Sequence, residues 1–572
     1  MARAPTWGAM SRRYDDVLDT VTQELNDRLA RLASAWKAEH GETLRVSLAP
    51  TRDATHGDFA TAAALAAAKA WKRNPLEIAQ AIAGEGLSNL DGVARLDAVK
   101  PGFVNITMAP RFWSDVVLDV LRLGPEYGKS DALVATGPML IEFVSANPTG
   151  PLVVVQGRSS ALGATLAAMF RFAGCKVETE TYVNDAGTQL DVLADSLYAR
   201  YATLLGTETP LPENGYAGEY LIDLARALAA RDGDRWRNAP IDERRRALGR
   251  FARDLIVDEQ RADLERFRVF FDHWTSETTL HESGAIEKAV EELRRLGHVF
   301  EKDEALWLRS TDFGDDKDRV LIRSDGRPTY LAADAAYHAD KLRRGHRYLI
   351  DILGPDHHGY IARLSALVAA LGHPGSLEVL LAQHVTFKRG GEAVSMSKRA
   401  GDLITLREVM DQVGVDAARF FFINRAPESH LVFDLELAVE QSSKNPVYYV
   451  QYGHARIASI LRKAAEGRAA LLERAHEGRD IAKLGHAAEI ALIRRLADFG
   501  RTVASAAEAR APHRLAEYVH SVATDFHSFY TECIVLGDDD ALTSARLSLC
   551  LAAKTVLASA LGLMGVSAPE VM

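Results

Sequence analysis

Apolar positions recur every three to four residues over long parts of the chain, and this spacing predicts helices. The pattern is clear at 13–40 and in the alanine-rich stretch 60–84. It continues through the charged region from about 190 to 300, and from about 410 to the end. Most of the chain is therefore expected to be helical.

A different pattern occupies the middle of the chain. Residues 139–144 form a short apolar run typical of a buried strand, and the turn-forming sequence SANPTG follows at 145–150. Residues 157–173 predict a helix that ends at Gly174, and 176–183 predict a second strand. Strand, turn, helix and strand make the first half of a doubly wound parallel sheet, whose ligands bind beyond the carboxyl ends of the strands.

Further strands are predicted at 320–322, 348–353 and 378–381, and two short strands flank the Pro101–Gly102 turn within 93–108. These patterns divide the chain into three predicted domains. Residues 1–125 form an α+β domain, 126–410 an α/β Rossmann-type domain with helical insertions, and 411–572 an all-α bundle.

Composition narrows the class of protein. Hydrophobic residues make up 47% of the 572 and charged residues 26%, which suits several soluble cores. We find no run of 18 apolar residues and no secretory leader, so neither a membrane span nor export is expected. The three cysteines are far apart and suggest no disulfides, in keeping with the cytoplasm. A net charge of -10 argues against a wholly basic nucleic-acid coat but allows a local basic face.

Two local motifs resemble a phosphate-binding loop and a zinc site, but each lacks the spacing that such a site needs. GPEYGKS at 124–130 has one residue too few between its glycines for a phosphate-binding P-loop. The neighbouring His357 and His358 lack the spaced partners of a zinc site. SMSKRAG at 395–401 is more informative, because a lysine on a glycine-flanked loop can close on a polyphosphate.

PTGPLVVVQGR at 148–158 and the distant MSK loop resemble, as a pair, the two signatures of class I aminoacyl-tRNA synthetases, HIGH and KMSKS. Further segments resemble the arginyl-tRNA synthetase family in the same order along the chain: HGDFATAAALAAAKA, PGFVNI, SANPTGP, YVNDAGTQ, RPTYLAADAAYH, GPDHHGY, MSKRAG, NPVYYVQYGHAR and LGLMGVSAPE. The resemblance implies a Rossmann-type catalytic domain, an N-terminal domain that touches the tRNA elbow, and a C-terminal anticodon-binding bundle.

The resemblance also implies a reaction. Such an enzyme joins L-arginine to ATP, which carries Mg²⁺, and passes arginine to the 3′ end of tRNA(Arg). It implies that Ser145, Asn147 and Asp356 contact arginine, and that Tyr330 and Asp334 form the guanidinium pocket. Four residues at the end of the second strand and just after it are expected to line the same crevice: Tyr182, Asn184, Asp185 and Gln189. No bound metal, no organic cofactor and no membrane are implied, and a monomer is expected.

ATP is expected at the two signatures. The residues assigned to it by resemblance are Gly150, Gly157, Met396, Ser397 and Lys398, with Gln156 and Lys398 catalytic. In the C-terminal bundle, Tyr449, Tyr452 and Arg456 recur at helical spacing. Aromatic and arginine side chains on one face can stack on unpaired bases, so these three are predicted to contact tRNA.

The first signature departs from the family pattern PLHVGH. It reads PLVVVQ, with Val153 and Gln156 in place of the histidines and Val155 in place of the glycine. The loss of one such donor costs about 2–4 kcal/mol if nothing replaces it. In a divergent enzyme the phosphates would be held by the helix N-terminus and four side chains: Gln156, Arg158, Lys398 and Arg399.

Two alternatives remain open beside the divergent enzyme. The chain could be a catalytically impaired paralogue that binds tRNA or arginine as a regulatory protein. A weaker possibility is an arginyl transferase that passes arginine to another acceptor. Retention of the predicted arginine pocket and of Lys398 favours the active arginine–tRNA ligase.

Overall fold

A five-stranded parallel sheet lies at the centre of the computed structural model, which describes residues 13–38, 44–51, 54–86, 90–394 and 404–572. Its strand order is β12-β11-β5-β6-β7. The strands are β5 (Met139–Glu142), β6 (Val177–Val183), β7 (His273–Ser276), β11 (Tyr348–Leu353) and β12 (Leu377–Leu381). All four neighbouring pairs are parallel, so every carboxyl end reaches the same edge. Every residue of β5 is buried, as expected for a central strand of a parallel sheet.

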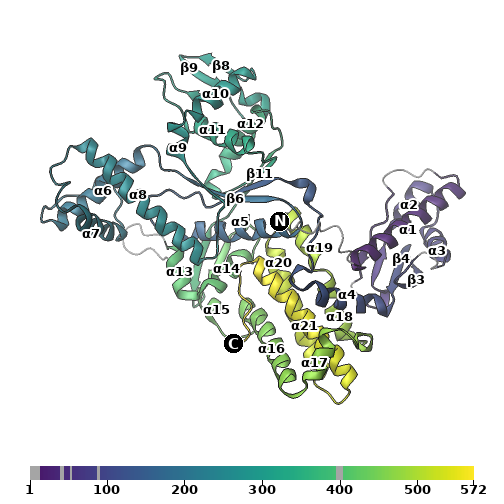
Figure 1. Ribbon diagram of the computed structural model, residues 1–572. Coiled ribbons are helices and arrows are strands. Elements are labelled where there is room, and N and C mark those ends of the chain that lie inside the picture. The colour runs from purple at the N-terminus through teal and green to yellow at the C-terminus, as the bar shows by residue number, and fades with distance from the viewer. Residues whose placement is uncertain (1–12, 39–43, 52–53, 87–89, 395–403) are drawn as a thin grey trace, which may run out of the picture.

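Helix α5 (Val154–Phe172) connects β5 to β6 and packs on the sheet. Gly163 allows this contact, because a Cβ there would lie 2.3 Å from the ring of Phe143. The opposite side of α5 meets α14 (Val415–Ile423), α19 (Phe499–Glu508) and α21 (Asp540–Leu563). Helix α5 therefore lies between the sheet and the C-terminal helices, as Figure 1 shows.

Two insertions project from the sheet. The first contains α6 (Thr188–Leu204), α7 (Tyr220–Asp232) and α8 (Ile241–Arg266), which enclose a core of their own. The second follows β7 and surrounds a small antiparallel sheet of order β10-β9-β8. Its elements are α9 (Glu277–Glu282), α10 (Ala285–Arg295), β8 (Val299–Lys302), β9 (Ala305–Leu308), β10 (Arg319–Ile322), α11 (Tyr330–Arg343) and, after β11, α12 (Ile361–Ala370).

The N-terminal domain is α+β, as predicted. Its antiparallel sheet has the order β1-β2-β4-β3 and is covered by α1 to α3. The bounds are α1 (Arg13–Ala35), β1 (Ala49–Pro50), β2 (Phe59–Thr61), α2 (Ala63–Trp71), α3 (Pro75–Gly84), β3 (Val93–Val99) and β4 (Phe103–Met108). The next helix, α4 (Pro110–Leu123), packs against α18 and α21 and so joins this domain to the C-terminal bundle.

The C-terminal bundle consists of α16 (Pro446–Gly467), α17 (Ala469–His476), α18 (Ala487–Ala497), α19, α20 (His513–Glu532) and α21. Helix α21 is long and apolar enough to span a membrane by length and composition, and 56% of its most apolar window is buried. It packs against α16, α17, α18 and α20. This burial is what a core helix of the bundle requires.

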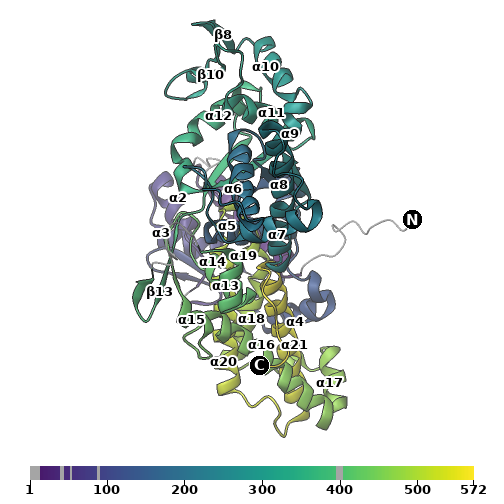
Figure 2. The same cartoon turned by 90° about the vertical axis from the view of Figure 1, so that its left-hand side faces the viewer.

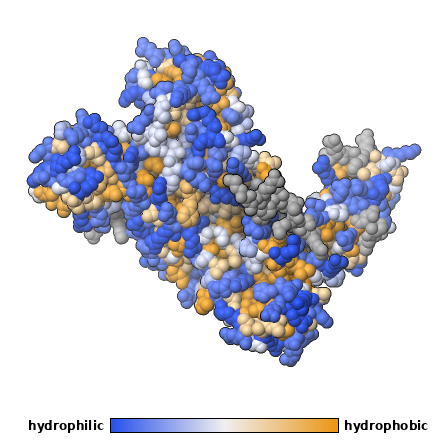
Figure 3. Space-filling model, in the orientation of Figure 1, coloured by the Kyte–Doolittle hydropathy of each residue, from blue (hydrophilic) through white to orange (hydrophobic). Residues whose placement is uncertain are grey.

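The molecule is elongated, with the second insertion at one end and the bundle at the other (Figure 2). The first insertion and the N-terminal domain extend from opposite sides of the centre (Figure 1). On the face shown in Figure 3, these projecting parts are mainly hydrophilic, and hydrophobic side chains are interspersed over the middle of the molecule.

Three element predictions need correction. The region 190–300 is not wholly helical, because the edge strand β7 lies within it. Helix α5 begins at Val154 and not at 157, so two of the three valines belong to its first turn. Strand β15 (Leu431–Asp434) interrupts the predicted helical tail and pairs with β13 (Val385–Arg389), which also pairs with β14 (Glu392–Val394). Short helices lie next to these strands in the sequence: α13 (Leu406–Val413), α14 and α15 (Leu435–Val439). Of these, α14 contacts β15 and α15 contacts β13.

Candidate active site

The carboxyl end of β5 passes into an unusual turn. Val144 and Ser145 have φ angles of 75° and 40°, in the left-handed region that residues with side chains seldom adopt. The Ser145 hydroxyl donates to Glu142 Oε1 at 2.6 Å and accepts from the Tyr182 backbone N–H at 3.2 Å. The Ser145 N–H donates to Thr181 Oγ1 at 3.3 Å. These bonds hold Ser145 between β5 and β6, at the sheet edge where ligands bind in this architecture.

Asp334 supplies a carboxylate to the same region from helix α11. It accepts a hydrogen bond from the Tyr360 hydroxyl, and its backbone carbonyl lies 2.9 Å from His338 Nδ1. Burial raises the pKa of Asp334, although the Tyr360 hydrogen bond lowers it. No lysine or arginine among the described residues lies within ion-pair distance of this carboxylate. A partly buried carboxylate without a cationic partner is suited to a cationic ligand.

The surroundings of Asp334 add negative charge. Glu277, at the start of α9, is 5% exposed, and burial raises its pKa, with Asp334 and Asp185 adding to the effect. The ring of Tyr182 lies 4.6 Å from the ring of Tyr337. Burial, then the charges of Glu277 and Asp334, raise the pKa of Tyr182, so its hydroxyl stays protonated. A cation would be stabilised beside these carboxylates.

The other residues predicted for arginine lie closer to solvent. Asn147 and Asp356 are exposed, and Tyr330, the first residue of α11, is 75% exposed. Of the residues expected to line the crevice, Gln189 is also exposed. Asp185 is buried, and its carboxylate accepts from the Ser276 hydroxyl at 2.8 Å and the Thr278 backbone N–H at 2.9 Å. The structure thus brings Ser145 and Asp334 into partly buried hydrogen-bond networks, and leaves Tyr330, Asn147 and Asp356 at the surface.

The PLVVVQ segment forms the start of α5. Val153 is the N-cap residue, and its backbone N–H donates to Gln156 Oε1 at 2.7 Å. This is one half of a capping box, in which the third helical residue satisfies the N-cap N–H. Val155 packs against the main core. The N-cap position of Val153, its bond to Gln156 and the packing of Val155 together build the start of α5. The free N–H groups and the dipole at a helix start attract anions.

The end of the MSK loop is attached to that helix start. The Val154 N–H donates to the Ile404 carbonyl at 3.0 Å, and the Leu406 N–H donates to the Leu152 carbonyl at 2.8 Å. Val153 and Thr405 also form a β-bridge. The predicted ATP residues Met396, Ser397 and Lys398, with Arg399, lie outside the described residues.

Arg158 does not reach the phosphate region, contrary to the prediction. It is fully buried and donates to the carbonyls of Gln383 at 2.7 Å and of Ser429 and Ala426 at 2.9 Å. Its guanidinium instead ties α5 to the segments around β12, β13 and β15. The three carbonyls satisfy the two terminal nitrogens of this buried cation, whereas its Nε has no hydrogen-bond partner among the described residues.

The two glycines assigned to ATP have structural surroundings of their own. A Cβ on Gly157 would lie 2.7 Å from Leu406 Cδ1, so close packing of α5 against α13 also requires a small residue here. Gly150 lies in the turn after β5, and its carbonyl accepts from Gln260 Nε2 at 2.8 Å. Gln260 also donates to the Asn147 carbonyl at 3.2 Å. Its role was missed, because it lies 110 residues from Gly150 in the sequence.

The predicted RNA-contact residues of α16 separate into two environments. Tyr449 packs between His520 and His527, with ring centroids 5.0 and 4.8 Å apart. Tyr452 and Arg456 line a surface cavity of about 270 Å³. The Arg456 guanidinium lies 4.8 Å from the Tyr452 ring centroid and 5.0 Å from that of Tyr530. Arg462 and Lys463 also line this cavity, so it combines aromatic and basic groups.

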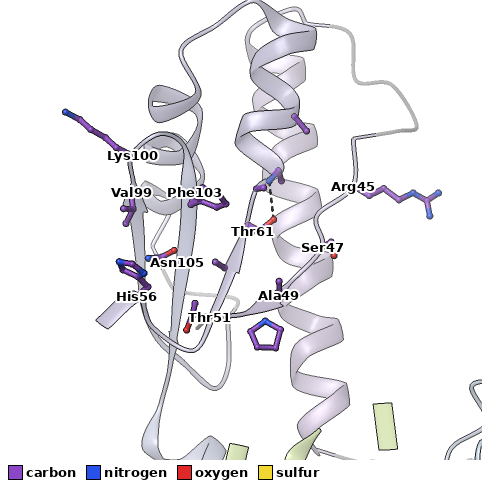
Figure 4. Close-up of a pocket in the computed structure, with 15 residues that line it drawn as sticks. Arg45, Ser47, Ala49, Thr51, His56, Thr61, Val99, Lys100, Phe103 and Asn105 are labelled. Carbon is purple, nitrogen blue, oxygen red and sulfur yellow. Dashed lines mark hydrogen bonds between the residues drawn. The ribbon is translucent and has the colours of Figure 1, made fainter. Parts of the chain in front are cut away.

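A larger cavity of about 810 Å³ lies on the N-terminal domain. Figure 4 shows Phe103 and Asn105 on one strand of its wall and His56 nearby, with Lys100 and Arg45 extending from opposite sides. Phe103 is 37% exposed, whereas Asn105 is 6% exposed. An open aromatic ring beside a buried amide offers both stacking and hydrogen bonding. The described residues include no group of three or more His, Cys, Asp or Glu able to hold a metal ion.

Comparisons with known proteins assign all three parts of the chain. Residues 19–108 match the arginyl tRNA synthetase N terminal domain, 126–440 the catalytic domain of class I (R) tRNA synthetases, and 450–572 the DALR anticodon binding domain. The arginine–tRNA ligase of Symbiobacterium thermophilum is 44% identical over 98% of this chain and 100% of its own length. That of Geobacillus kaustophilus is 44% identical over 97% and 100%. The arginyl-tRNA synthetase of Thermus thermophilus has the same fold, with a TM-score of 0.74 at 23% identity over 98% of this chain and 100% of that one.

Proposed function

Because the chain belongs to the arginyl-tRNA synthetase family and has arginine–tRNA ligase activity, we propose that Asp334 and Ser145 form the core of its arginine site. The substrates are arginine, ATP and tRNA. The observation that carries the proposal is the Asp334 carboxylate, which is partly buried and has no basic partner among the described residues. A substrate guanidinium supplies that partner and makes charge-assisted hydrogen bonds with it.

The surroundings support a cation of this kind. Tyr360 fixes the Asp334 carboxylate, and Glu277, which lies 3.6 Å from His281, places a second acidic group nearby. We assign Ser145, held in its left-handed turn, to the α-amino and carboxylate groups of arginine. We assign the exposed Tyr330, Asn147 and Asp356 to the mouth of the site, where they contact arginine as it binds.

The phosphates of ATP, with their Mg²⁺, are placed at the N-terminus of α5. The Gln156 Oε1 atom is occupied by the Val153 N–H, which orients the amide and leaves its NH₂ group to donate to a phosphate oxygen. The attachment of Ile404 and Leu406 to the same turn keeps the following end of the Lys398 loop beside it. Lys398 then stabilises the charge that develops on the phosphates.

The reaction proceeds in two transfers. The arginine carboxylate attacks the α-phosphorus of ATP, which forms arginyl-adenylate and releases pyrophosphate. A hydroxyl of the terminal tRNA ribose then attacks the arginyl carbonyl, and AMP leaves. Positioning by Asp334 and Ser145 contributes to both steps, because both need the arginine carboxyl group at a fixed place. Nothing in the comparisons favours the impaired paralogue or the arginyl transferase.

We place tRNA on two surfaces. The cavity of Tyr452, Arg456 and Tyr530 binds unpaired anticodon bases by stacking, and its basic residues contact phosphates. The cavity of Phe103 and Asn105 takes a nucleotide of the tRNA elbow. The domains remain assigned as 1–125, 126–410 and 411–572. We expect a monomer in the cytoplasm that is not attached to a membrane. The three buried, free cysteines support the reducing compartment alone.

The test is the arginine requirement of an Asp334→Asn variant. The neutral amide loses the charge of the pair, so KM for arginine should rise about a hundredfold, which corresponds to about 3 kcal/mol, with KM for ATP within about twofold of the wild type. Steady-state charging of an arginine tRNA transcript measures both constants. The matched control is Asp340→Asn, on the same helix, whose carboxylate pairs with Arg344. Equal losses for arginine and ATP would contradict the proposed pocket.

A further inference from the structure

A row of three buried carboxylates crosses the central sheet next to the proposed arginine site. Glu142 ends β5 and is paired in register with Asp351 on β11 and with Glu180 on β6. The three residues are 6%, 2% and 0% exposed. Cross-strand neighbours in register point to the same face of a sheet, so three acidic groups are buried side by side. Such a row is costly unless cations and hydrogen bonds compensate for it.

Helix α11 and the residue after it supply that compensation. Lys341 is fully buried and donates to Glu142 Oε2 and, at 3.0 Å, to Asp351 Oδ1. His338 Nε2 lies 3.0 Å from Asp351 Oδ2. Arg344 donates to Glu180 Oε2 at 2.5 Å. The two cations therefore pair with different carboxylates of the row: Lys341 pairs with Glu142 and Asp351, and Arg344 pairs with Glu180.

Only one of these carboxylates continues into the arginine site. The second oxygen of Glu142, Oε1, accepts the Ser145 hydroxyl proton at 2.6 Å, and Ser145 in turn accepts from the Tyr182 N–H. Val144 and Ser145 have left-handed φ angles, so the turn needs such restraints to keep its shape. Lys341 thus fixes the carboxylate that orients Ser145.

The same lysine lies on the helix that carries Asp334. Asp334, His338 and Lys341 follow one another at helical spacing, and His338 also bonds the Asp334 carbonyl. One side of the site, Asp334, and the other, Ser145, are therefore joined by a continuous path through Lys341 and Glu142. Burial opposes the charge of Lys341, but its two carboxylates raise its pKa, so it remains a cation.

We propose that Lys341 is a positioning residue for arginine: through Glu142 it sets the orientation of Ser145 relative to Asp334, without touching the substrate. The inference rests on the proposed arginine site. It predicts that loss of the Lys341 charge impairs the use of arginine specifically, because the ATP phosphates are placed at a different turn. A lysine with a purely structural role would affect stability and both substrates alike.

The experiment compares three substitutions in the full chain. Lys341→Gln keeps a hydrogen-bond donor, on a side chain one bond shorter, but removes the charge. It should raise KM for arginine about tenfold to a hundredfold while KM for ATP stays within about twofold. Lys341→Arg restores the cation and should recover most of that loss. Arg344→Gln is the matched control, because Arg344 serves Glu180, which does not bond Ser145, and it should leave KM for arginine unchanged.

The outcomes separate this inference from the function on which it rests. A thermal unfolding midpoint is recorded for each variant, and Glu142→Gln is included in case Lys341→Gln does not fold. Glu142→Gln retains an acceptor for Ser145 but loses the ion pair, and it should show the same selective rise. If Asp334→Asn impairs arginine use and neither Lys341→Gln nor Glu142→Gln does, the inference is wrong and the pocket stands. If Asp334→Asn has no effect, the proposed pocket itself is wrong.

Discussion

At the scale of single residues, the site depends on polar groups whose environment differs from water. Asp334 illustrates this, because burial raises its pKa above the ordinary value of 3.8, and the Tyr360 hydrogen bond and the charges of His338 and Lys341 offset only part of the effect. Gln156 illustrates a second case, since one side-chain atom caps a helix and the other end is left to donate. Each residue leads to a prediction that can be measured.

The first concerns the pH dependence of arginine binding. Because the pKa of Asp334 is raised, this carboxyl stays protonated in a fraction of the free protein molecules above pH 3.8. A bound guanidinium lowers that pKa. Binding should therefore release a proton in this acidic range, and affinity should increase with pH until Asp334 is ionised in the free protein. Calorimetry at about pH 5, in two buffers of different ionisation enthalpy, counts the protons.

The contribution of Asp334 to folding stability changes with pH in the opposite direction to arginine affinity. A carboxyl whose pKa is raised by folding contributes stability at low pH, and this contribution is lost as the pH rises through the folded-state pKa.

The control for proton release on arginine binding is the Asp334→Asn variant, which should release no proton from this position at any pH. A proton release that is the same in this variant and in the wild type would assign it to another group.

The second prediction at this scale concerns Gln156 as a donor to the ATP phosphates. Gln156→Glu keeps an oxygen to cap the Val153 N–H but removes the amide donor and adds negative charge near the phosphates. Its kcat should fall by at least about a hundredfold, with little change in the free energy of unfolding. Gln156→Ala loses the cap as well, so its free energy of unfolding should be lower by about 1 kcal/mol. Wild-type kcat in both variants would place the phosphates elsewhere.

At the scale of secondary-structure elements, the connection between β5 and α5 determines where the site lies. The helix must approach the sheet closely so that its N-terminus and the carboxyl end of β5 lie at the same edge. Gly163 makes this approach possible, since its missing side chain is where the Phe143 ring packs. Gly157 has the same function on the opposite side of the helix, against Leu406.

Gly163→Ala should therefore destabilise the protein by about 1–3 kcal/mol through overpacking, as chemical denaturation would show. Phe143→Leu in the same chain should relieve part of this cost, so the two changes should be less harmful together than their sum. Gly562→Ala in α21 is the control, because nothing lies within 4 Å of a Cβ there. Additive effects of the Gly163 and Phe143 substitutions would mean that their contact is not the cause.

At the scale of the whole molecule, the N-terminal domain is held against the C-terminal bundle by buried polar contacts. Arg494 on α18 donates to Asp58, which is 6% exposed and also accepts from the Met108 N–H at 2.6 Å. The Arg494 guanidinium lies 5.3 Å from the Trp113 ring centroid. Together with the packing of α4 on α18 and α21, this contact fixes the relative placement of the two surfaces to which we assign tRNA.

Arg494→Ala should weaken tRNA binding about tenfold, because it leaves Asp58 without its cation and loosens the relative placement of the two domains. KM for arginine should remain at the wild-type value. The neighbouring Arg495→Ala is the control, since Arg495 pairs with Asp525 inside the bundle at 2.8 Å. Filter-binding with an arginine tRNA transcript measures the dissociation constant. Equal weakening in both variants would show that the bundle itself, and not the domain contact, was disturbed.

The sequence by itself determined the local structure and the chemical class. Period-two and period-3.6 patterns depend only on neighbours in the chain, so they located β6, β11, the N-terminal α+β domain and most helices, and the ordered motifs were sufficient to indicate the family. The short strand β7 was missed because four residues of an edge strand give no clear period.

The tertiary structure alone decided which of the polar residues act together. Arg158 is next to the first signature in sequence but is bonded to carbonyls 225 to 271 residues away. Lys341 and Glu142, which are 199 residues apart, form one buried pair. Partners of this kind are chosen by strand order and helix packing, and no local pattern records them. A buried charge is stable only beside its partner, and the folded chain determines where that partner lies.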